Sequence, residues 1–414
     1  MDKNMHYKDH RKTLEPLQAS ACRIYKKIPH TGVWGISPRI LRKAFYLVLV
    51  SCMVMITNTA SALKIADFDV DITGKVGERF DDNVTYVKDG EKDDFITDLD
   101  AGFDIKRRTK TWDMDLTGTL RQDIYVNNNS FNNFSQDVGL DAAGELTKYD
   151  RITVSDSFLH AEEPRSFEDE SGNEEGRYDY YRNNFNFGYS RDIARQFSID
   201  LGYANGIFIP DKTDISDSYL NSGRVVLNYL PNTATILYCI YDFTHRHFEP
   251  GGDSPTHSTL GGIRRYFTET VYFDGYAGAD FIRTTDKKDL TKLNLMGSVT
   301  GEFSEKTKAV IKFDKKFNQT YYSGDVSDFW SVSGSVSSNV LKRVNIDASV
   351  YFSRGEYEGN GRTDNFFGSN MGLSYDLMEN VKASLSYNFS LKDSDEGTNE
   401  YVKNVISAGV GYRF

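Results

Sequence analysis

The sequence contains few of the residues that stabilise small secreted domains or build catalytic centres. Its 414 residues include only 3 cysteines, 8 prolines and 7 histidines. Beyond residue 62, Cys239 is the single cysteine and only four histidines remain. One cysteine cannot form an internal disulfide framework, so the stability of the chain has to come from hydrogen bonding or from packing.

The chain also lacks long hydrophobic runs and a basic surface. Beyond residue 62, no segment reaches the roughly 18 consecutive apolar residues that a membrane-spanning helix needs. This part of the chain holds 39 lysines and arginines against 57 aspartates and glutamates, a net charge of −18. Phosphate binding requires clustered basic residues, so the composition argues against nucleic acid as a partner.

The first 62 residues have the features of an export signal. The apolar run 44–56 follows Arg39, Arg42 and Lys43 and is too short to span a bilayer. Ala60 and Ala62 supply the small residues of a signal-peptidase site, so we predict a signal peptide with an extended basic n-region over 1–62 and a mature domain over 63–414. Two alternatives stay open, lipoprotein processing at Cys52 and a translation start further along the chain.

The mature sequence is organised by alternation of apolar and polar residues. In one segment Trp112, Met114, Leu116 and Leu120 alternate with polar residues, which gives one apolar and one wet face. About eighteen such segments, each of roughly ten residues, fill the chain to its end. Such strands average to neutral hydropathy and still present a continuous apolar belt, so the pattern predicts an all-β, antiparallel up-and-down transmembrane barrel of about 18 strands.

The connections between the segments support a transmembrane barrel. Eight short connections alternate with nine longer ones, among which we count 160–177, 205–216 and 246–256. Short turns on one rim and long loops on the other are typical of outer-membrane barrels, with the short turns in the periplasm. Soluble β-sandwiches and secreted β-solenoids also alternate, but the aromatic residues near the strand ends favour the membrane.

The last residues of the chain provide a further indication. Val410, Tyr412 and Phe414 alternate with polar residues or glycine, and Phe414 is the final residue. This ending resembles the signal by which outer-membrane barrels are handed to the barrel assembly machinery. We therefore expect an integral protein of the outer membrane of Gram-negative bacteria, in contact with lipid and lipopolysaccharide.

Two stretches in the first third of the mature chain resemble a known family. They are 77–97, which reads GERFDDNVTY and then DDFIT, and 149–156, which reads YDRITVSD. Both are similar to the putative β-barrel porin-2 family, although Phe80 stands where that family usually has tyrosine. The resemblance implies a barrel that assists exopolysaccharide export, with a periplasmic polysaccharide export protein and a polysaccharide as partners.

The polar register, if it lines the lumen, separates charges along the chain. Facing charges in a narrow lumen would set up a transverse field that orients dipolar solutes. The alternative is that the wall is simply polar. The predicted acidic wall consists of Asp69, Asp71, Asp98, Asp100, Asp104, Asp113, Asp115, Asp123, Asp137 and Asp141, and the predicted basic wall of Lys292, Lys308, Lys312, Lys316, Lys382, Lys392 and Arg413.

Other lumen residues provide weaker indications of function. Tyr238, Tyr272, Tyr276 and Tyr351 fall in the inward register, where they either fill space or stack on sugars. A serine row over 331–337 suits hydroxyl-rich solutes only weakly.

Catalysis and metal binding have little support. An enzymatic barrel needs a histidine, a nucleophile and an orienting residue within reach of one another, and the sequence offers no such pattern. His245 and His247 share one face of a strand without a third ligand nearby in sequence. The acidic stretch 162–175 lacks the spacing of a calcium loop and is interpreted as a solvated loop.

We therefore predict a channel with no cofactor, no metal site and no catalytic residues. Polysaccharide export is the first hypothesis, because the family resemblance implies it. A general or sugar-preferring diffusion porin is the second hypothesis, and a barrel enzyme is a distant third.

Overall fold

The structure is a closed barrel of antiparallel strands. The computed structural model describes residues 63–65, 67–172, 177–213, 215–319, 326–359 and 361–414. The predicted signal peptide, with its cleavage residues Ala60 and Ala62 and the alternative site Cys52, lies outside the described residues. The eighteen strands β2–β19 confirm the expected 18-stranded barrel, and the short strand β1 pairs with the beginning of β2.

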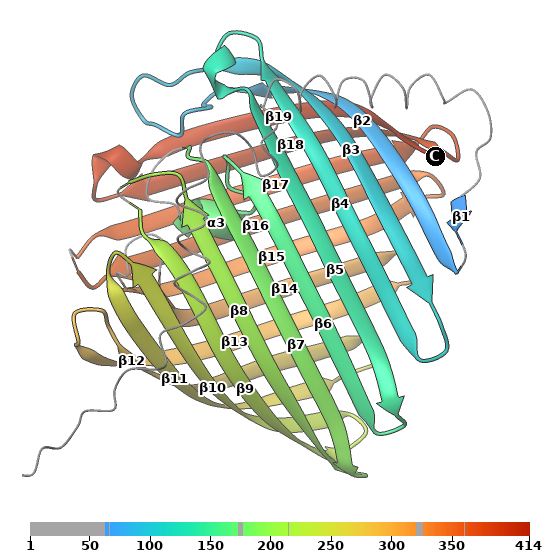
Figure 1. Ribbon diagram of the computed structural model, residues 1–414, viewed down its shortest axis with the longest axis vertical. Helices are drawn as coiled ribbons and strands as arrows, with labels where there is room; N and C mark the ends of the chain where they lie inside the picture. The colour runs from blue at the N-terminus through green and yellow to red at the C-terminus, as the bar shows by residue number, and fades with distance from the viewer. Residues whose placement is uncertain (1–62, 66, 173–176, 214, 320–325, 360) are drawn as a thin grey trace, which may run out of the picture. The chain divides into compact units, whose positions relative to one another are not determined.

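The strands follow one another around the barrel in chain order. Figure 1 shows the early strands crossing the front and the late strands crossing behind them at an angle, as the tilted strands of a barrel do. The strands are β1 (Leu63–Ile65), β2 (Phe68–Asp81), β3 (Asp94–Arg108), β4 (Trp112–Tyr125), β5 (Asn133–Thr147), β6 (Asp150–Ala161), β7 (Tyr180–Ala194), β8 (Phe197–Pro210), β9 (Asp217–Asn232), β10 (Thr235–Glu249), β11 (Gly252–Tyr266), β12 (Val271–Arg283), β13 (Asp289–Ser304), β14 (Thr307–Gln319), β15 (Val326–Leu341), β16 (Val344–Tyr357), β17 (Thr363–Asp376), β18 (Val381–Ser394) and β19 (Tyr401–Arg413).

The barrel is closed by pairing of the last strand with the first long strand. β19 and β2 pair antiparallel from Val405 opposite Asp81 to Arg413 opposite Thr73. The backbone N–H of Phe414 donates to the carbonyl of Ile72 at 2.8 Å, so the pairing extends to the final residue. Closure removes both sheet edges, which a strand in hydrocarbon cannot leave unpaired.

The outer face of the barrel is apolar. Large side chains at alternate strand positions are exposed there, for example Leu293, Val299 and Ile311 on β13 and β14. The residues between them, such as Ser298 and Lys312, point to the other side of the sheet. A closed sheet whose exposed face is apolar belongs in a bilayer. Among the described residues, no helix is long and apolar enough to span a membrane.

The connections match the expected asymmetry with one clear exception. Turns of two to four residues join the strands at one rim, and the longest connection at the other rim is the 18-residue segment 162–179 between β6 and β7. The expected long loop at 246–256 is wrong, because β10 continues to Glu249 and β11 starts at Gly252. Gly252 has φ of 145°, and Gly251 packs so closely on Phe248 that a Cβ there would lie 2.9 Å from it, so these glycines allow a tight turn.

The buried apolar side chains gather near the long-loop rim. One cluster joins Val84, Ile96 and Tyr125, and a second joins Tyr86, Tyr351, Phe366 and Tyr401. Val84 and Tyr86 belong to the loop 82–93, and the others lie on strands. A third cluster joins Tyr178 of the loop 162–179 to Leu159, Tyr180 and Phe208. Among the described residues, the buried apolar side chains therefore form separate clusters where loops meet the inner wall, and not one continuous core.

The orientation of the side chains predicts the effect of a charge on each face. Val299→Lys places a cation against lipid and should lower the free energy of unfolding by about 2–4 kcal/mol. Ser298→Lys, one residue earlier, faces the inside between Asp274 and Lys312 and should lower it much less, because its ammonium group stays in contact with water. Urea unfolding in lipid vesicles measures both, and equal losses would show that the assigned faces are wrong.

The C-terminal residues lie where an assembly signal would be accessible. Val410 is 51% exposed on the outer face, and the rings of Tyr412 and Phe414 pack at 4.7 Å. We propose that these three residues form the assembly signal. Deleting Phe414 should then reduce the folded, heat-modifiable form in the outer membrane several-fold, whereas Phe303→Ala, which removes an exposed aromatic residue at the same rim, should not. Normal assembly of the deletion variant would contradict this role.

Candidate functional site

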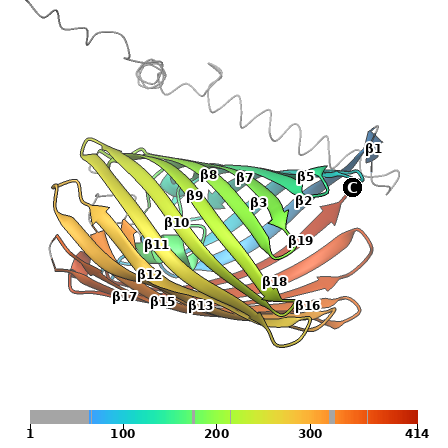
Figure 2. The same ribbon diagram turned by 90° about the horizontal axis from the view of Figure 1, so that it is seen from below.

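The described part of the loop 162–179 enters the barrel and carries the short helix α3 (Phe167–Gly172). Phe167 of α3 stacks with Tyr351 on β16, while Asp169 is paired with Arg182 on β7. β7 and β16 are nine strands apart, half of the circumference. Both contacts lie on the face opposite to the exposed apolar side chains, so α3 crosses the lumen. Figure 2 shows it within the ring of strands.

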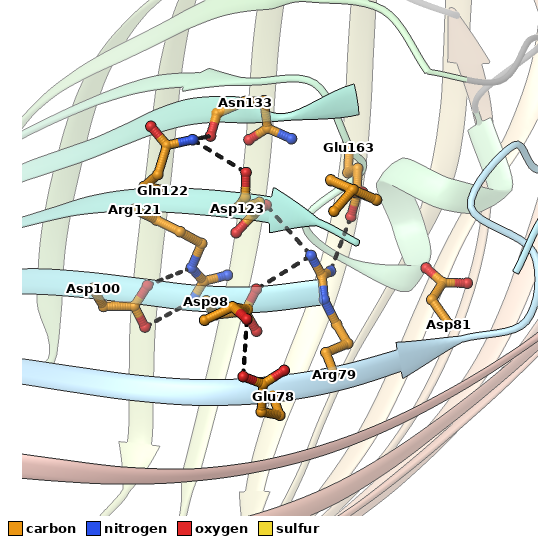
Figure 3. Close-up of polar contacts among 12 residues, drawn as sticks. Glu78, Arg79, Asp81, Asp98, Asp100, Arg121, Gln122, Asp123, Asn133 and Glu163 are labelled. Carbon is orange, nitrogen blue, oxygen red and sulfur yellow. Dashed lines mark hydrogen bonds and ion pairs between the residues drawn. The ribbon is translucent and has the colours of Figure 1, made fainter. Parts of the chain in front are cut away.

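The first anchor of the loop is an ion cluster on β2, β3 and β4 (Figure 3). Glu163 accepts a hydrogen bond from the Arg79 guanidinium at 3.2 Å. The same guanidinium lies 3.4 Å from Asp98 and 3.4 Å from Asp123. Arg79 is therefore shared by three carboxylates, of which only Glu163 comes from the loop. Removing one partner of such a buried cluster costs about 3–5 kcal/mol, because the other charges stay buried without compensation.

A second arginine completes the environment of Glu163. Arg177 lies 2.9 Å from the Glu163 carboxylate and 2.8 Å from Glu162. Its guanidinium stacks over the rings of Tyr125 and Phe131, at 4.9 Å from each centroid. The Tyr125 hydroxyl also donates to Glu163, at 2.6 Å. Glu163 thus joins the start of the loop to the barrel wall through Arg79 and Tyr125, and it joins the start of the loop to its end through Arg177.

These positive neighbours determine the charge state of Glu163. Burial alone would raise the pKa of the Glu163 carboxyl, but Arg79, Arg177 and Lys403 hold that pKa well below its usual range. A depressed pKa contributes stability above the ordinary glutamate pKa, and this contribution is lost only in strong acid. The first anchor is therefore fully formed at neutral pH.

The second anchor holds α3 against β16–β19. The Phe167 ring lies 6.0 Å from that of Phe366, over Gly368, where a Cβ would come within 2.6 Å of it. Glu170 accepts hydrogen bonds from Ser390 at 2.5 Å and from Tyr401 at 3.0 Å. Gly368 thus leaves the space in which the aromatic side chain of the loop packs.

The loop 82–93 packs against this second anchor. Tyr86 packs edge-on against Tyr401 at 5.3 Å. The ammonium of Lys403 lies 3.8 Å from the Tyr86 ring centroid and 2.6 Å from the Asp81 carboxylate. Tyr86 takes a φ of 55°, so a non-glycine residue holds a left-handed conformation here. The buried Lys403 has both a charge partner and an aromatic face.

The opposite part of the inner wall, over β9–β14, carries several cations that are open to solvent. The side chains of Arg224, Arg264 and Lys312 are 56%, 40% and 47% exposed, compared with 14% for Arg79. Each forms an ion pair with an aspartate on the wall, Asp242, Asp274 and Asp314 respectively. On β2 and β3, the inward Lys75 and Lys106 are likewise 45% and 42% exposed, so the inner wall is open to water wherever the loop does not cover it.

All ten residues of the predicted acidic wall fall in the register that faces inward. Six of them form ion pairs with nearby cations: Asp100 with Arg121 and Lys75, Asp98 and Asp123 with Arg79, Asp104 with Lys106, and Asp113 and Asp115 with Arg108. Asp69 lies opposite Lys106, Asp71 opposite Asp104, Asp137 opposite Thr119, and Asp141 opposite Asp115. The wall is therefore a mixed ladder of both signs.

The predicted basic wall shows the same pairing. The inward lysines meet carboxylates as follows: Lys292 with Glu358, Lys308 with Glu302, Lys312 with Asp314, Lys382 with Asp376 and Lys392 with Asp364. Lys316 lies opposite Phe329, and Arg413 opposite Thr73. These pairs weaken the separation of charge that the sequence suggested, and the transverse field stays a prediction.

The interpretation of 162–175 as a solvated loop is wrong for its described part. Glu163, Asp169 and Glu170 are bonded inside the barrel. Sequence reasoning missed this because the partners of these side chains lie far away in the chain, such as Arg79 and Tyr401. The signal that could have found it is the mixture of acidic residues with Phe167 and Arg177, which is unusual for a freely solvated loop.

The described histidines contact tyrosine or aspartate side chains. His160 stacks on Tyr181 and lies 2.8 Å from Asp179, and His257 is bonded to Tyr241. His245 and His247 both approach Asp253, at 3.5 and 2.8 Å. Over the described part of the chain, no group of three histidine, cysteine or carboxylate side chains has the geometry of a metal site.

Comparison with known proteins supports the barrel assignment. Residues 274–414 match a family model described as "Putative beta-barrel porin 2". The resemblance noted in the sequence is thereby confirmed, although the match begins in β12 and excludes the motifs at 77–97 and 149–156. No curated protein matches the chain. Together with the closed sheet and its apolar exterior, the match identifies an integral outer-membrane barrel of the porin type.

Solved structures with a similar fold share little sequence. OccAB3 of Acinetobacter baumannii is 10% identical with a TM-score of 0.44, over 84% of this chain and 100% of that one. OpdL of Pseudomonas aeruginosa is 10% identical with a TM-score of 0.43, over 84% and 99%. The siderophore receptor PirA of the same organism is 8% identical with a TM-score of 0.43, over 85% and 81%.

The second anchor should respond to pH with the opposite sign from the first. Burial raises the pKa of the Glu170 carboxyl, only partly opposed by Ser390, Lys403 and Tyr401. A raised pKa means that docking is most stable below the ordinary glutamate pKa of about 4.3 and weakens as pH rises through the raised value. In the unmodified protein, weaker docking of α3 at higher pH should increase the open-channel noise, which single-channel recordings between pH 4 and 8 measure. Glu170→Gln should abolish this dependence of the noise on pH.

The same helix offers a matched control for this measurement. Glu168 is exposed on α3, so Glu168→Gln should keep the noise increase of the unmodified protein as pH rises. If Glu170→Gln behaves like Glu168→Gln, the carboxyl of Glu170 does not control docking.

Proposed function

We propose that this outer-membrane barrel of the porin type is a selective channel for small polar solutes, with a lumen narrowed by the loop 162–179. One observation carries the proposal: α3 is held on both sides of the lumen. Phe167 packs on Phe366 of β17, and Asp169 pairs with Arg182 of β7, while cations on β9–β14 such as Arg224 stay exposed to water. A loop held at both ends reduces the cross-section permanently. The solute path then runs along β9–β14.

The chemistry of this wall favours neutral or zwitterionic solutes. The exposed arginines and lysine on it are each balanced by an aspartate. A wall with paired charges offers hydrogen bonds without a strong preference for one sign. The acidic and basic walls expected from the sequence add a residual field, which we propose orients dipolar solutes as they pass.

Polysaccharide export is the second candidate function, and the family resemblance favours it. A polymer chain would have to pass the anchored loop, so export requires that α3 leave β16–β19. The second anchor is the weaker one for this purpose, because it consists of the ring contacts of one aromatic side chain and the hydrogen bonds of one carboxyl. We propose that a periplasmic polysaccharide export protein, if it is the partner, acts by releasing this anchor.

Release of the second anchor should widen the channel. The double variant Phe167→Ala, Glu170→Ala removes the aromatic contact and the hydrogen bonds to Ser390 and Tyr401. We expect single-channel conductance in planar bilayers to rise about two- to threefold, with Glu168→Ala as the control on the same helix. Unchanged conductance in the double variant would contradict the proposed constriction.

A crosslink separates the two candidate functions. Phe167 lies against Gly368, so Phe167→Cys with Gly368→Cys offers a disulfide that fixes α3 to β17. A diffusion channel should keep its small-solute flux when the pair is oxidised, because its loop never moves. Loss of polymer secretion on oxidation, restored by reductant, would instead support export.

A further inference from the structure

The open wall of β9–β14 carries aromatic side chains that the proposed channel does not yet explain. We infer that Tyr238 and Tyr276, with the Asp274–Arg264 pair, form a binding site for a neutral sugar ring on the path of the solute. This inference rests on the proposed channel and specifies the class of solute that it binds. The site uses three neighbouring strands, β10, β11 and β12.

The orientation of Tyr238 is the first step of the argument. Its hydroxyl donates to the Asp274 carboxylate at 2.7 Å and also reaches the carbonyl of Gly275 at 3.2 Å, both on β12. The ring therefore crosses the whole of β11, and it does so at Gly262, where a Cβ would lie 2.2 Å from a ring carbon. The absence of a side chain at Gly262 lets the ring lie flat along the wall.

A ring that lies flat on the wall turns its other face toward the lumen. Tyr238 and Tyr276 are both partly exposed, and Tyr276 stands directly opposite Gly262 in the strand register. Neither ring makes a stacking or cation–π contact with another side chain in the described part of the chain. The two rings therefore form neighbouring aromatic surfaces whose lumen-facing sides have no stacking partner in the described part of the chain.

Charged side chains surround these aromatic surfaces. Arg264 donates to Asp274 at 2.5 and 3.1 Å, so the carboxylate that receives Tyr238 is held in place. Arg264 lies opposite Ile236 of β10, and six residues further from the short-turn rim on the same strand Asp242 forms a second two-bonded pair with Arg224, at 2.6 and 2.7 Å. Each pair is neutral as a whole and retains unused donors and acceptors.

This combination fits a pyranose ring. A sugar ring presents C–H groups on its faces and hydroxyl groups at its edge. The C–H face packs on an aromatic face, while the edge hydroxyls bond to carboxylates and guanidinium groups in the plane of the wall. A charged solute would gain nothing from the neutral pairs, and an apolar one would leave them without hydrogen bonds.

The position of the site gives it a direction along the channel. Tyr272 and Tyr266 pack at 5.3 Å next to the short turn 267–270, and Arg264 lies over the Tyr272 ring at 5.5 Å. From that rim inward the wall therefore presents Tyr272, then Arg264 with Asp274, then Tyr238 with Tyr276. The short-turn rim is the periplasmic one in outer-membrane barrels, so the series leads from the periplasm toward the outside.

Blocking of the ionic current by sugars tests the site. Uncharged hexasaccharides of α-glucose, β-glucose and β-galactose are added to single channels, with polyethylene glycol of equal hydrodynamic size as the non-binding polymer. At least one sugar should block with lifetimes about tenfold longer than those of the glycol, equivalent to ~1.4 kcal/mol. Tyr238→Ala with Tyr276→Ala should abolish the difference, and Thr119→Ala, on the inner wall of β4, should retain it.

A conservative variant separates ring stacking from the hydrogen bond. Tyr238→Phe keeps the aromatic face and loses only the hydrogen bonds of the hydroxyl to Asp274 and to the Gly275 carbonyl, so it should retain a longer sugar block than the double alanine variant. Two results would overturn the site. One is that sugars and glycol block the unmodified protein for equal times. The other is that sugars block the double alanine variant for as long as they block the unmodified protein.

The failure of the site and that of the channel can be told apart. If the purified protein passes no current, the proposed channel is wrong, and isothermal titration of the same sugars into the detergent-solubilised protein still tests the site. If it conducts and no sugar is distinguished from the glycol, the channel stands and the sugar site is wrong.

Discussion

Every backbone group that faces the membrane must find its partner on a neighbouring strand, and the pairing of β19 with β2 makes this possible. With that pairing, no strand of the barrel leaves an unpaired edge in hydrocarbon, and the outer face can be apolar without a core behind it. The interior therefore does not need a close-packed apolar core. Its side chains can be polar and can pair with one another or stay in water.

Buried charge is the second constraint, and the barrel meets it by pairing. Glu163 and Glu170 belong to the same loop and are both buried, yet their pKa values are shifted in opposite directions. Glu163 lies among arginines, whereas Glu170 meets hydroxyl groups and only one nearby lysine. The loop therefore combines an anchor that is permanently ionised at neutral pH with one whose charge state depends on its surroundings.

The alternating pattern of the sequence predicted the strands and their two faces well. It does so because a strand in a barrel has one lipid-facing and one lumen-facing side throughout its length. Some of the charge pairing could also have been predicted, since Asp100 and Arg121 are direct cross-strand neighbours. The course of the loop 162–179 could not, because Glu163 and Arg79 are 84 positions apart and meet only after the barrel has closed. The error at 246–256 has a local origin, since Pro250 and its glycines suit a tight turn as well as a long loop.

The two anchors of the loop have little dependence on the salinity outside the cell. The ion pairs of Arg79 and Arg177 are largely shielded from solvent and are screened little by dissolved salt, and the contact of Phe167 with Phe366 carries no charge to be screened. Neither attachment loosens when the medium becomes more concentrated. The bore of the channel should therefore stay constant between fresh and saline surroundings, while the exposed ion pairs on the open wall, such as Arg224 with Asp242, adjust their strength to each.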